Sequence, residues 1–370
     1  MDGRHTVVCK LGTSTLVDAT GAPDKVFIEG LMGQVARLAH EGYGVVVVSS
    51  GAVAAGLERL GFSERPHDMP TLQACAAAGQ ASLTEAYAEV LARRGVPCGQ
   101  VLITRRDLVD REGYLNVRNT LQRLVELGAV PVVNENDTVS VAEFAFGDND
   151  TLGAIVASLV GAQLYVILSD VDGLYTANPQ THPEARLLSE VHGVTPEVAA
   201  MAGGAGTAWG TGGMATKVRA ARASLAAGIP MVVCRGRREN VLVDAAHGED
   251  VGTRFVPLEG QGHEAGRKLW IGLAERPHGS LVLDAGACRA VQEQGASVLP
   301  VGVTEVRGTF AAGDVVDVVS QDGIVVGRGL ARYSSEEMVR VRGLRLDVIA
   351  RFMPERAGQP AVHRDELLVF

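Results

Sequence analysis

Residues 130–159 read VPVVNENDTVSVAEFAFGDNDTLGAIVASL, and their pattern decides the fold. The segment begins as an apolar, β-branched run typical of a buried strand, turns polar, and continues after Gly147-Asp148-Asn149-Asp150 with helical spacing. In open α/β sheets, ligands bind beyond the carboxyl ends of strands. We therefore expect Asn134, Asp137 and residues 148–150 to line a binding crevice. Helix capping accounts for any one of these residues, since Asp and Asn are preferred caps, but not for the whole set.

The alternation of strand and helix extends in both directions from this segment. It predicts an α/β domain with a mostly parallel sheet sandwiched by helices and right-handed crossovers. Strands are expected at 6–11, 45–48, 99–104, 164–168 and 229–234, and helices at 27–40, 74–94 and 115–127. The pattern ends near Pro257.

The sequence changes character after residue 258. A glycine-rich polar stretch, LEGQGHEAG, precedes short β-type runs at 280–283, 297–300, 302–306, 315–319 and 324–330. Runs of this length and spacing predict a separate, small β-barrel-like domain. We place the first domain at 1–258, a linker at 259–274, the second domain at 275–355 and a C-terminal tail at 356–370.

Composition restricts the function. The formal net charge is -9 and aromatic residues make up 4%, which argues against a nucleic-acid-binding surface and suits an enzyme of small molecules. Five scattered cysteines without CxxC spacing predict free thiols in a reducing compartment, and no Cys/His pattern predicts zinc. The start lacks a signal-peptide pattern, and the longest mostly apolar stretch, 153–168, is too short for a bilayer. We expect a cytoplasmic protein.

Lysine is rare, because arginine supplies 30 of the 34 basic residues and the lysines are Lys10, Lys25, Lys217 and Lys268. Lys10 ends a buried strand before Gly12-Thr13-Ser14, where a lysine is costly unless it meets an anion. Lys217 follows a segment with six glycines, 203–213, in the first turn of a predicted helix, where the macrodipole disfavours a cation. A bound phosphate would reverse that penalty, so we favour a phosphate loop over a flexible surface loop.

Two further loops follow predicted strands. Ser49-Ser50-Gly51 offers free amides and a hydroxyl for a carboxylate or phosphate, although a helix cap explains this loop better when it is taken alone. Residues 169–179, SDVDGLYTANP, lie at the end of the strand at 164–168. They predict either a nucleotide contact or a structural loop.

Taken in order, these motifs resemble the glutamate 5-kinases of the amino acid kinase family along essentially the whole chain. The motifs that carry the resemblance are Lys10-Leu-Gly-Thr-Ser, Ser49-Ser50-Gly-Ala-Val, Asn134-Glu-Asn-Asp137, Gly147-Asp-Asn-Asp150, Gly173-Leu-Tyr-Thr and Gly210-Thr-Gly-Gly-Met-Ala-Thr-Lys217. The C-terminal module resembles a PUA domain. The resemblance implies ATP-dependent phosphorylation of the side-chain carboxylate of L-glutamate, the first step of proline synthesis.

The resemblance also implies a role for each residue. Lys10 and Lys217 would neutralise the transferring phosphoryl group, and Asp150 would hold the lysines in place. The residues implied for glutamate are Ser50, Asn134, Asp137, Asp148 and Asn149. Those implied for ATP are Lys10, Ser169, Asp170, Thr211, Gly212, Gly213, Met214, Ala215, Thr216 and Lys217. Mg2+ would be held mainly by the phosphates, with no protein ligand named.

Regulation and assembly are implied in the same way: inhibition by proline and a homo-oligomer (dimer or tetramer). The sequence leaves open whether the next enzyme of the pathway docks to receive the acyl phosphate. Two alternatives stay open. A related kinase would act on acetylglutamate, aspartate, carbamate or a nucleotide, although paired acids and amides favour a free ammonium group. PUA modules commonly bind RNA, but residues 276–355 hold nine Arg against ten acids, so a solvated surface is favoured.

Overall fold

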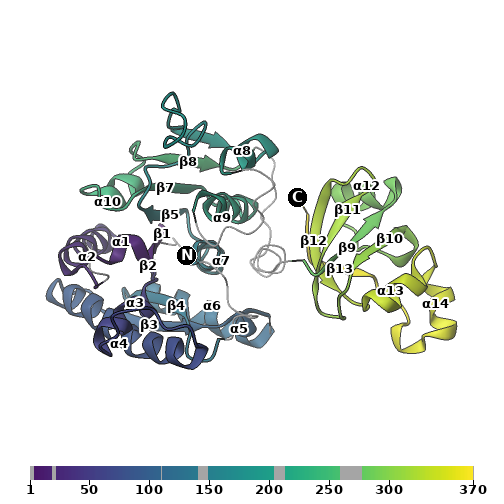
Figure 1. The fold of residues 1–370 in the computed structure, drawn as a ribbon, viewed down its shortest axis with the longest axis horizontal. Coiled ribbons are helices and arrows are strands. Elements are labelled where there is room, and N and C mark those ends of the chain that lie inside the picture. Colours follow the sequence, from purple (N-terminus) through teal and green to yellow (C-terminus); the bar gives the residue numbers. More distant parts are fainter. Residues whose placement is uncertain are drawn as a thin grey trace. The chain divides into compact units, whose positions relative to one another are not determined.

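A computed structural model of the chain describes residues 4–18, 22–109, 111–140, 149–203, 213–258 and 277–369. The chain divides into two compact units, Met1–His263 and Glu264–Phe370 (Figure 1). Each unit has its own sheet. Among the described helices, none combines the length and apolar character that crossing a bilayer requires.

The first unit is built on an eight-stranded sheet with the order β3-β4-β2-β1-β5-β7-β8-β6. Its strands are β1 Thr6–Leu11, β2 Gly44–Val48, β3 Cys98–Ile103, β4 Val130–Glu135, β5 Leu164–Ser169, β6 Glu190–His192, β7 Met231–Arg235 and β8 Thr253–Val256. The strands from β3 to β7 in this order pair in parallel, whereas β8 runs antiparallel to β7 and pairs in parallel with β6. The expected mostly parallel sheet is confirmed, and the two short strands at its end, β8 and β6, were not predicted.

Helices cover the sheet on both faces. They are α1 Thr13–Leu16, α2 Lys25–His40, α3 Ala52–Arg59, α4 Met69–Arg93, α5 Arg105–Val109, α6 Arg111–Glu126, α7 Asn149–Val160, α8 Pro196–Met201, α9 Met214–Ala226 and α10 Val241–Ala246. Helix α2 contacts α4 and α10, and α4 contacts α3, while α7 contacts α6 and α9, so two separate layers form. Figure 1 shows α7 and α9 side by side next to the central strands.

Strand β1 lies between β2 and β5. The strands that follow it along the chain are first added on the β2 side of the sheet and then, from β5 onward, on the other side. Successive side chains of a strand point to opposite faces. Val7, Cys9 and Leu11 join the core beneath α2, so Lys10 points to the opposite face, where α7 packs on β1. The alternation of side chains along β1 thereby places the ammonium group of Lys10 beside the first turn of α7.

Helices α3 and α4 pack with their backbones in contact. A Cβ atom on Gly56 would lie 1.7 Å from the Cys75 carbonyl oxygen, and one on Gly79 would lie 1.9 Å from that of Ala52. Only glycine fits at such an approach. The contact fixes α4 against the loop Ser49–Gly51, which leads into α3.

The second unit contains a five-stranded sheet with the order β10-β9-β11-β12-β13. Its elements are β9 Gly279–Leu283, α12 Ala285–Gln294, β10 Val303–Gly308, β11 Val315–Ser320, β12 Val325–Ala331, α13 Ser335–Val341, α14 Leu346–Phe352 and β13 Val362–Val369. Four of the strands match predicted β-runs, whereas the three helices were not predicted. The stretch expected as a tail contributes β13, which pairs antiparallel with β12.

Candidate active site

Two lysines converge on one carboxylate at the carboxyl end of β1, and we call Lys10, Asp150 and Lys217 the charged centre. The Lys10 Nζ atom lies 2.6 Å from Asp150 Oδ1, and the Lys217 Nζ atom lies 3.4 Å from Oδ2. The Thr216 hydroxyl donates to the same Oδ2 at 2.9 Å. Residues 66 or more positions apart along the chain thus meet because α7 and α9 begin beside the end of β1.

All three members of the charged centre are buried, with side-chain exposures of 10% or less. Burial alone would raise the pKa of Asp150, but the charges of Lys10 and Lys217 outweigh it and lower the pKa below its ordinary value. Asp150 is therefore ionised at neutral pH. Two ammonium groups on one carboxylate leave a net positive charge, which suits the centre for a polyanion such as triphosphate.

A tyrosine fixes the backbone of Asp150. The Tyr165 hydroxyl on β5 donates to the Asp150 carbonyl oxygen at 2.7 Å. A Cβ atom on Gly153 would lie 2.2 Å from that hydroxyl, so glycine at this position of α7 makes the contact possible. Sequence reasoning missed both residues, since neither belongs to a motif.

Amide and hydroxyl side chains occupy the ends of the neighbouring strands. The Asn149 Nδ2 atom, at the start of α7, lies 3.0 Å from Ser50 Oγ and 2.9 Å from Asn134 Oδ1. It also donates to the Ser49 carbonyl oxygen at 2.6 Å. The structure thus brings together Ser50, Asn134 and Asn149, three of the residues that the family resemblance assigns to glutamate.

Beside these residues lies a cavity of about 240 Å³ between α4 and the end of β4. Its lining includes Asp137, Asn136 and Thr138 after β4 and Gln80 from α4. Asp137, which follows β4, is the carboxylate among these residues that the sequence analysis assigned to glutamate, and burial raises its pKa. A partly desolvated carboxylate of this kind gains from an incoming cation such as an ammonium group.

Apart from Lys10, the described residues that are predicted to bind ATP lie at the carboxyl end of β5 and at the start of α9. The Ser169 hydroxyl donates to Asp170 Oδ1 at 3.0 Å. Gly213 adopts φ +91° immediately before α9, whose first turn holds Met214, Ala215, Thr216 and Lys217. Asp148, Thr211 and Gly212 lie outside the described residues, and their roles stay predictions.

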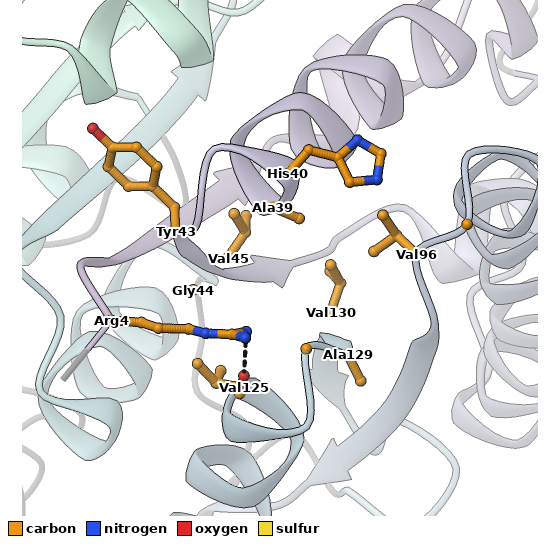
Figure 2. Close-up of a pocket in the computed structure, with 12 residues that line it drawn as sticks. Arg4, Ala39, His40, Tyr43, Gly44, Val45, Val96, Val125, Ala129 and Val130 are labelled. Carbon is orange, nitrogen blue, oxygen red and sulfur yellow. Dashed lines mark hydrogen bonds between the residues drawn. The ribbon is translucent and has the colours of Figure 1, made fainter. Parts of the chain in front are cut away.

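A smaller hollow of about 120 Å³ lies at the opposite end of the strands (Figure 2). Aliphatic side chains such as Val45, Val96 and Val130 line it, and the Arg4 guanidinium donates to the Val125 carbonyl oxygen at 3.1 Å. Gly44 and Val130 are the first residues of β2 and β4, so this hollow is remote from the charged centre. It is therefore not the candidate site.

Within the described ranges, no group of three or more His, Cys, Asp or Glu side chains is placed to hold a metal ion. In the charged centre, both carboxylate oxygens of Asp150 already contact lysine. The geometry of this centre therefore fits an anion that carries its own metal ion better than a metal ion bound by the protein.

Comparison with known proteins identifies the families that the two units match. The sequence profile of the amino acid kinase family matches residues 5–235, and that of the PUA domain matches residues 279–353. A glutamate 5-kinase of Geobacter sp. (strain M21) is 45% identical over 363 residues, which cover 98% of this chain and 97% of the relative. A glutamate 5-kinase of Myxococcus xanthus (strain DK1622) is 47% identical, with coverages of 98% and 96%.

A solved structure extends the comparison to the fold. The structure of a carbamate kinase from Giardia lamblia bound to AMP-PNP matches with a TM-score of 0.52 and 20% sequence identity. The match covers 70% of this chain and 100% of that chain. At this identity the likeness concerns the fold alone.

Proposed function

The chain belongs to the amino acid kinase family, and from this premise we propose that it phosphorylates the side-chain carboxylate of L-glutamate with ATP. The product is L-glutamyl 5-phosphate, and the reaction is the first step of proline biosynthesis. The observation that carries the proposal is the convergence of Lys10 and Lys217 on Asp150 beside a cluster of amides. Relatives of nearly the same length that bear the name glutamate 5-kinase support the choice of acceptor.

The reaction requires that the glutamate carboxylate and the γ-phosphoryl group are aligned and that the negative charge of the transferring group is neutralised. A glutamate carboxylate oxygen attacks the γ-phosphorus of ATP, the bond to the β–γ bridging oxygen breaks, and ADP leaves with the electron pair. The attacking carboxylate is already ionised at neutral pH, so no general base is required. Negative charge spreads over the transferring oxygens in the transition state, where preorganised cations stabilise it.

In this proposal Lys10 and Lys217 approach the transferring phosphoryl group from two sides, and Asp150 keeps both ammonium groups in place. Lys217 lies in the first turn of α9, where the helix dipole disfavours a cation but favours the phosphate that it would contact. The Thr216 hydroxyl reaches Asp150 and so helps to orient the carboxylate.

The remaining residues divide between the two substrates. Ser169, Asp170 and residues 211–217 bind ATP. Asp137 and Asn149 accept hydrogen bonds from the α-ammonium group of glutamate, and Ser50 and Asp148 are assigned to the same substrate. Asn134 is buried and hydrogen-bonded to Asn149, so it acts through Asn149.

Magnesium would enter with the nucleotide, held by phosphate oxygens, and would offset part of the charge of the triphosphate. The contacts of Asp150 with Lys10 and Lys217 take up its oxygens in the charged centre. We therefore assign no protein ligand to the ion.

We extend the proposal to regulation and assembly. Proline inhibits at or near the glutamate site, the chain forms a homo-oligomer in the cytoplasm, and the next enzyme of the pathway docks to receive the labile acyl phosphate. Steady-state kinetics with added proline test the first point, and an unchanged glutamate saturation curve would reject it. Analytical ultracentrifugation tests the second.

The decisive experiment measures ADP formation with ATP, magnesium and free glutamate while hydroxylamine traps the acyl phosphate as hydroxamate. We expect glutamate-dependent hydroxamate in proportion to ADP. N-acetylglutamate serves as the matched acceptor, because it has the same side chain and a blocked amine. Turnover of N-acetylglutamate in preference to glutamate would refute the substrate assignment while leaving the kinase assignment intact.

A further inference from the structure

Gln80 occupies the middle of α4, and its buried side chain reaches Asn134 at the end of β4. It is 7% exposed and lines the cavity that also contains Asp137. Its neighbour Gly79 lies against the Ala52 carbonyl oxygen, so the α3–α4 contact fixes the position of Gln80 relative to the strand ends.

A directional chain of amide hydrogen bonds runs from Gln80 to the start of α7. The Gln80 Nε2 atom donates to Thr84 Oγ1 at 3.1 Å, and its Oε1 atom accepts from Asn134 Nδ2 at 2.7 Å. The Asn134 Oδ1 atom accepts from Asn149 Nδ2 at 2.9 Å. We call Gln80, Asn134 and Asn149 the amide chain.

The direction of the chain matters because an amide group has a donor end and an acceptor end. Since Gln80 presents its oxygen to Asn134, the Asn134 oxygen is turned toward the backbone amide of Glu135, at 2.9 Å, and toward Asn149. Asn149 in turn uses its Nδ2 atom for every side-chain hydrogen bond found within the described ranges. No described side chain or backbone amide donates to its Oδ1 atom, which can therefore accept from a ligand.

We propose that Gln80 is a positioning residue that sets the preference of the site for a free ammonium group. Its carbonyl fixes the orientation of Asn134, and through Asn134 it holds the Asn149 carbonyl toward the bound amino acid. The inference rests on the proposed function, because it assigns the ammonium of glutamate as the group that this carbonyl receives.

The orientation of the Asn149 amide decides which of its atoms the ammonium group of the substrate meets. A rotated Asn149 amide would present two N–H groups to the ammonium and repel it. A dicarboxylate that lacks the ammonium group, such as glutarate, does not sense this rotation. Glutamate and glutarate together therefore report on the orientation of the amide and not only on the integrity of the fold.

The test substitutes Gln80→Met, which keeps an unbranched side chain of similar length but removes both hydrogen-bonding atoms. Asn134 then loses the acceptor of its buried N–H, so we expect the KM for glutamate to rise about tenfold. The Ki of glutarate as a competitive inhibitor and the KM for ATP should stay within about twofold of wild type. Gln80→Glu keeps an acceptor for Asn134 and should restore a KM near that of wild type.

The matched control is Gln34→Met on α2, which loses a comparable contact because Gln34 Oε1 accepts from the Leu242 backbone amide at 2.9 Å, away from the site. It should leave all three constants unchanged. An unchanged KM for glutamate in Gln80→Met would overturn the inference, as would a parallel change in all three constants. If Gln80→Met does not fold, Thr84→Val carries the test, because it frees the Gln80 amide to rotate, and a severalfold rise in the KM for glutamate alone is expected.

Failure of the inference and failure of the proposed function give different results. Wild-type protein that forms no glutamate-dependent hydroxamate refutes the proposed function before any variant is measured. Active wild-type protein combined with an unchanged Gln80→Met variant refutes only the positioning role.

Discussion

The charged centre and the amide chain lie at the same edge of one sheet but use opposite chemistry. In the charged centre, Lys10 and Lys217 meet Asp150 with little exposure to solvent. In the amide chain, Gln80, Asn134 and Asn149 hold one another through neutral hydrogen bonds of 2.7 and 2.9 Å.

The difference corresponds to what each part must do. Charge develops on the transferring phosphoryl group, and buried cations stabilise it strongly. Recognition of an amino acid instead requires that donors and acceptors point in fixed directions, which neutral amides provide without the cost of burying another charge. Substitutions in the two parts should therefore fail in different ways.

The largest effect on stability is expected for Asp150→Ala. The substitution leaves Lys10 and Lys217 buried without their counter-charge, and breaking a buried ion pair costs about 3–5 kcal/mol. Urea denaturation measures the free energy of unfolding. Asp170→Ala removes an exposed carboxylate at the end of β5 and is the matched control, for which we expect little change. Equal stability of the two variants would show that the charged centre does not depend on its carboxylate.

The largest effect on turnover is expected for Lys10→Ala and Lys217→Ala. Each removes a cation aimed at the transition state, so kcat should fall by about 10² or more, with little change in the KM for glutamate. Lys25→Ala, which removes an exposed lysine at the start of α2, should leave kcat unchanged. Near-normal kcat in either active-site variant would remove that residue from the catalytic assignment.

A smaller effect is expected when the support of the amide chain is disturbed. Gly79→Ala introduces a Cβ atom 1.9 Å from the Ala52 carbonyl oxygen and forces α3 away from α4, at a cost of about 1–3 kcal/mol. The KM for glutamate should rise with it. Gly30→Ala is the matched control, because a Cβ atom there meets nothing within 4 Å and alanine favours a helix. An equal loss of unfolding free energy in Gly79→Ala and Gly30→Ala would show that the α3–α4 contact is not the cause.

Each member of the charged centre carries a local signal in the sequence. A lysine at the end of a β-branched run, a lysine in the first turn after glycines, and an aspartate at a helix start are each visible within a few residues. The parallel sheet then brings the carboxyl ends of the strands to one edge. Lys10, Asp150 and Lys217 meet at this edge, a grouping that the sequence implied only through the family resemblance.

The amide chain was predicted only in part because its support is non-local. Gln80 lies in an alanine-rich helix and bonds to a residue 54 positions away, so no periodicity or spacing marks it. Tyr165 is likewise one of several apolar-looking residues in a buried strand. Such contacts follow from packing rather than from local propensity.

The sequence of the second unit contains a helix-start signal that the prediction of strands alone overlooked. Ser334 and Glu337 form a capping box at the start of α13, a pattern readable in the sequence as Ser-x-x-Glu. The many short β-runs around it suggested strands alone. In the first unit, the short strands β6 and β8 contain only three and four residues, too few for a clear alternation.

The smallest effect is expected in the pH dependence of stability, which distinguishes Asp150 of the charged centre from Asp137, which lines the cavity beside the amide chain. The pKa of Asp150 is lowered, so its contribution to stability is present above the ordinary value of 3.8 and is lost only as the pH falls through the folded-state pKa. Burial raises the pKa of Asp137, so its protonated form favours the folded state, and this contribution is lost as the pH rises above 3.8 through the folded-state pKa.

Between neutral pH and 3.8, therefore, only Asp137 of this pair changes its contribution. We expect Asp137→Asn to be more stable than wild type at neutral pH, with an advantage that shrinks as the pH falls toward 3.8. The deficit of Asp150→Asn should stay constant over the same range, since Asp150 remains ionised. Urea denaturation at stepped pH values measures both differences. A pH-independent difference for Asp137→Asn would mean that this carboxylate titrates like an exposed one and that the cavity does not desolvate it.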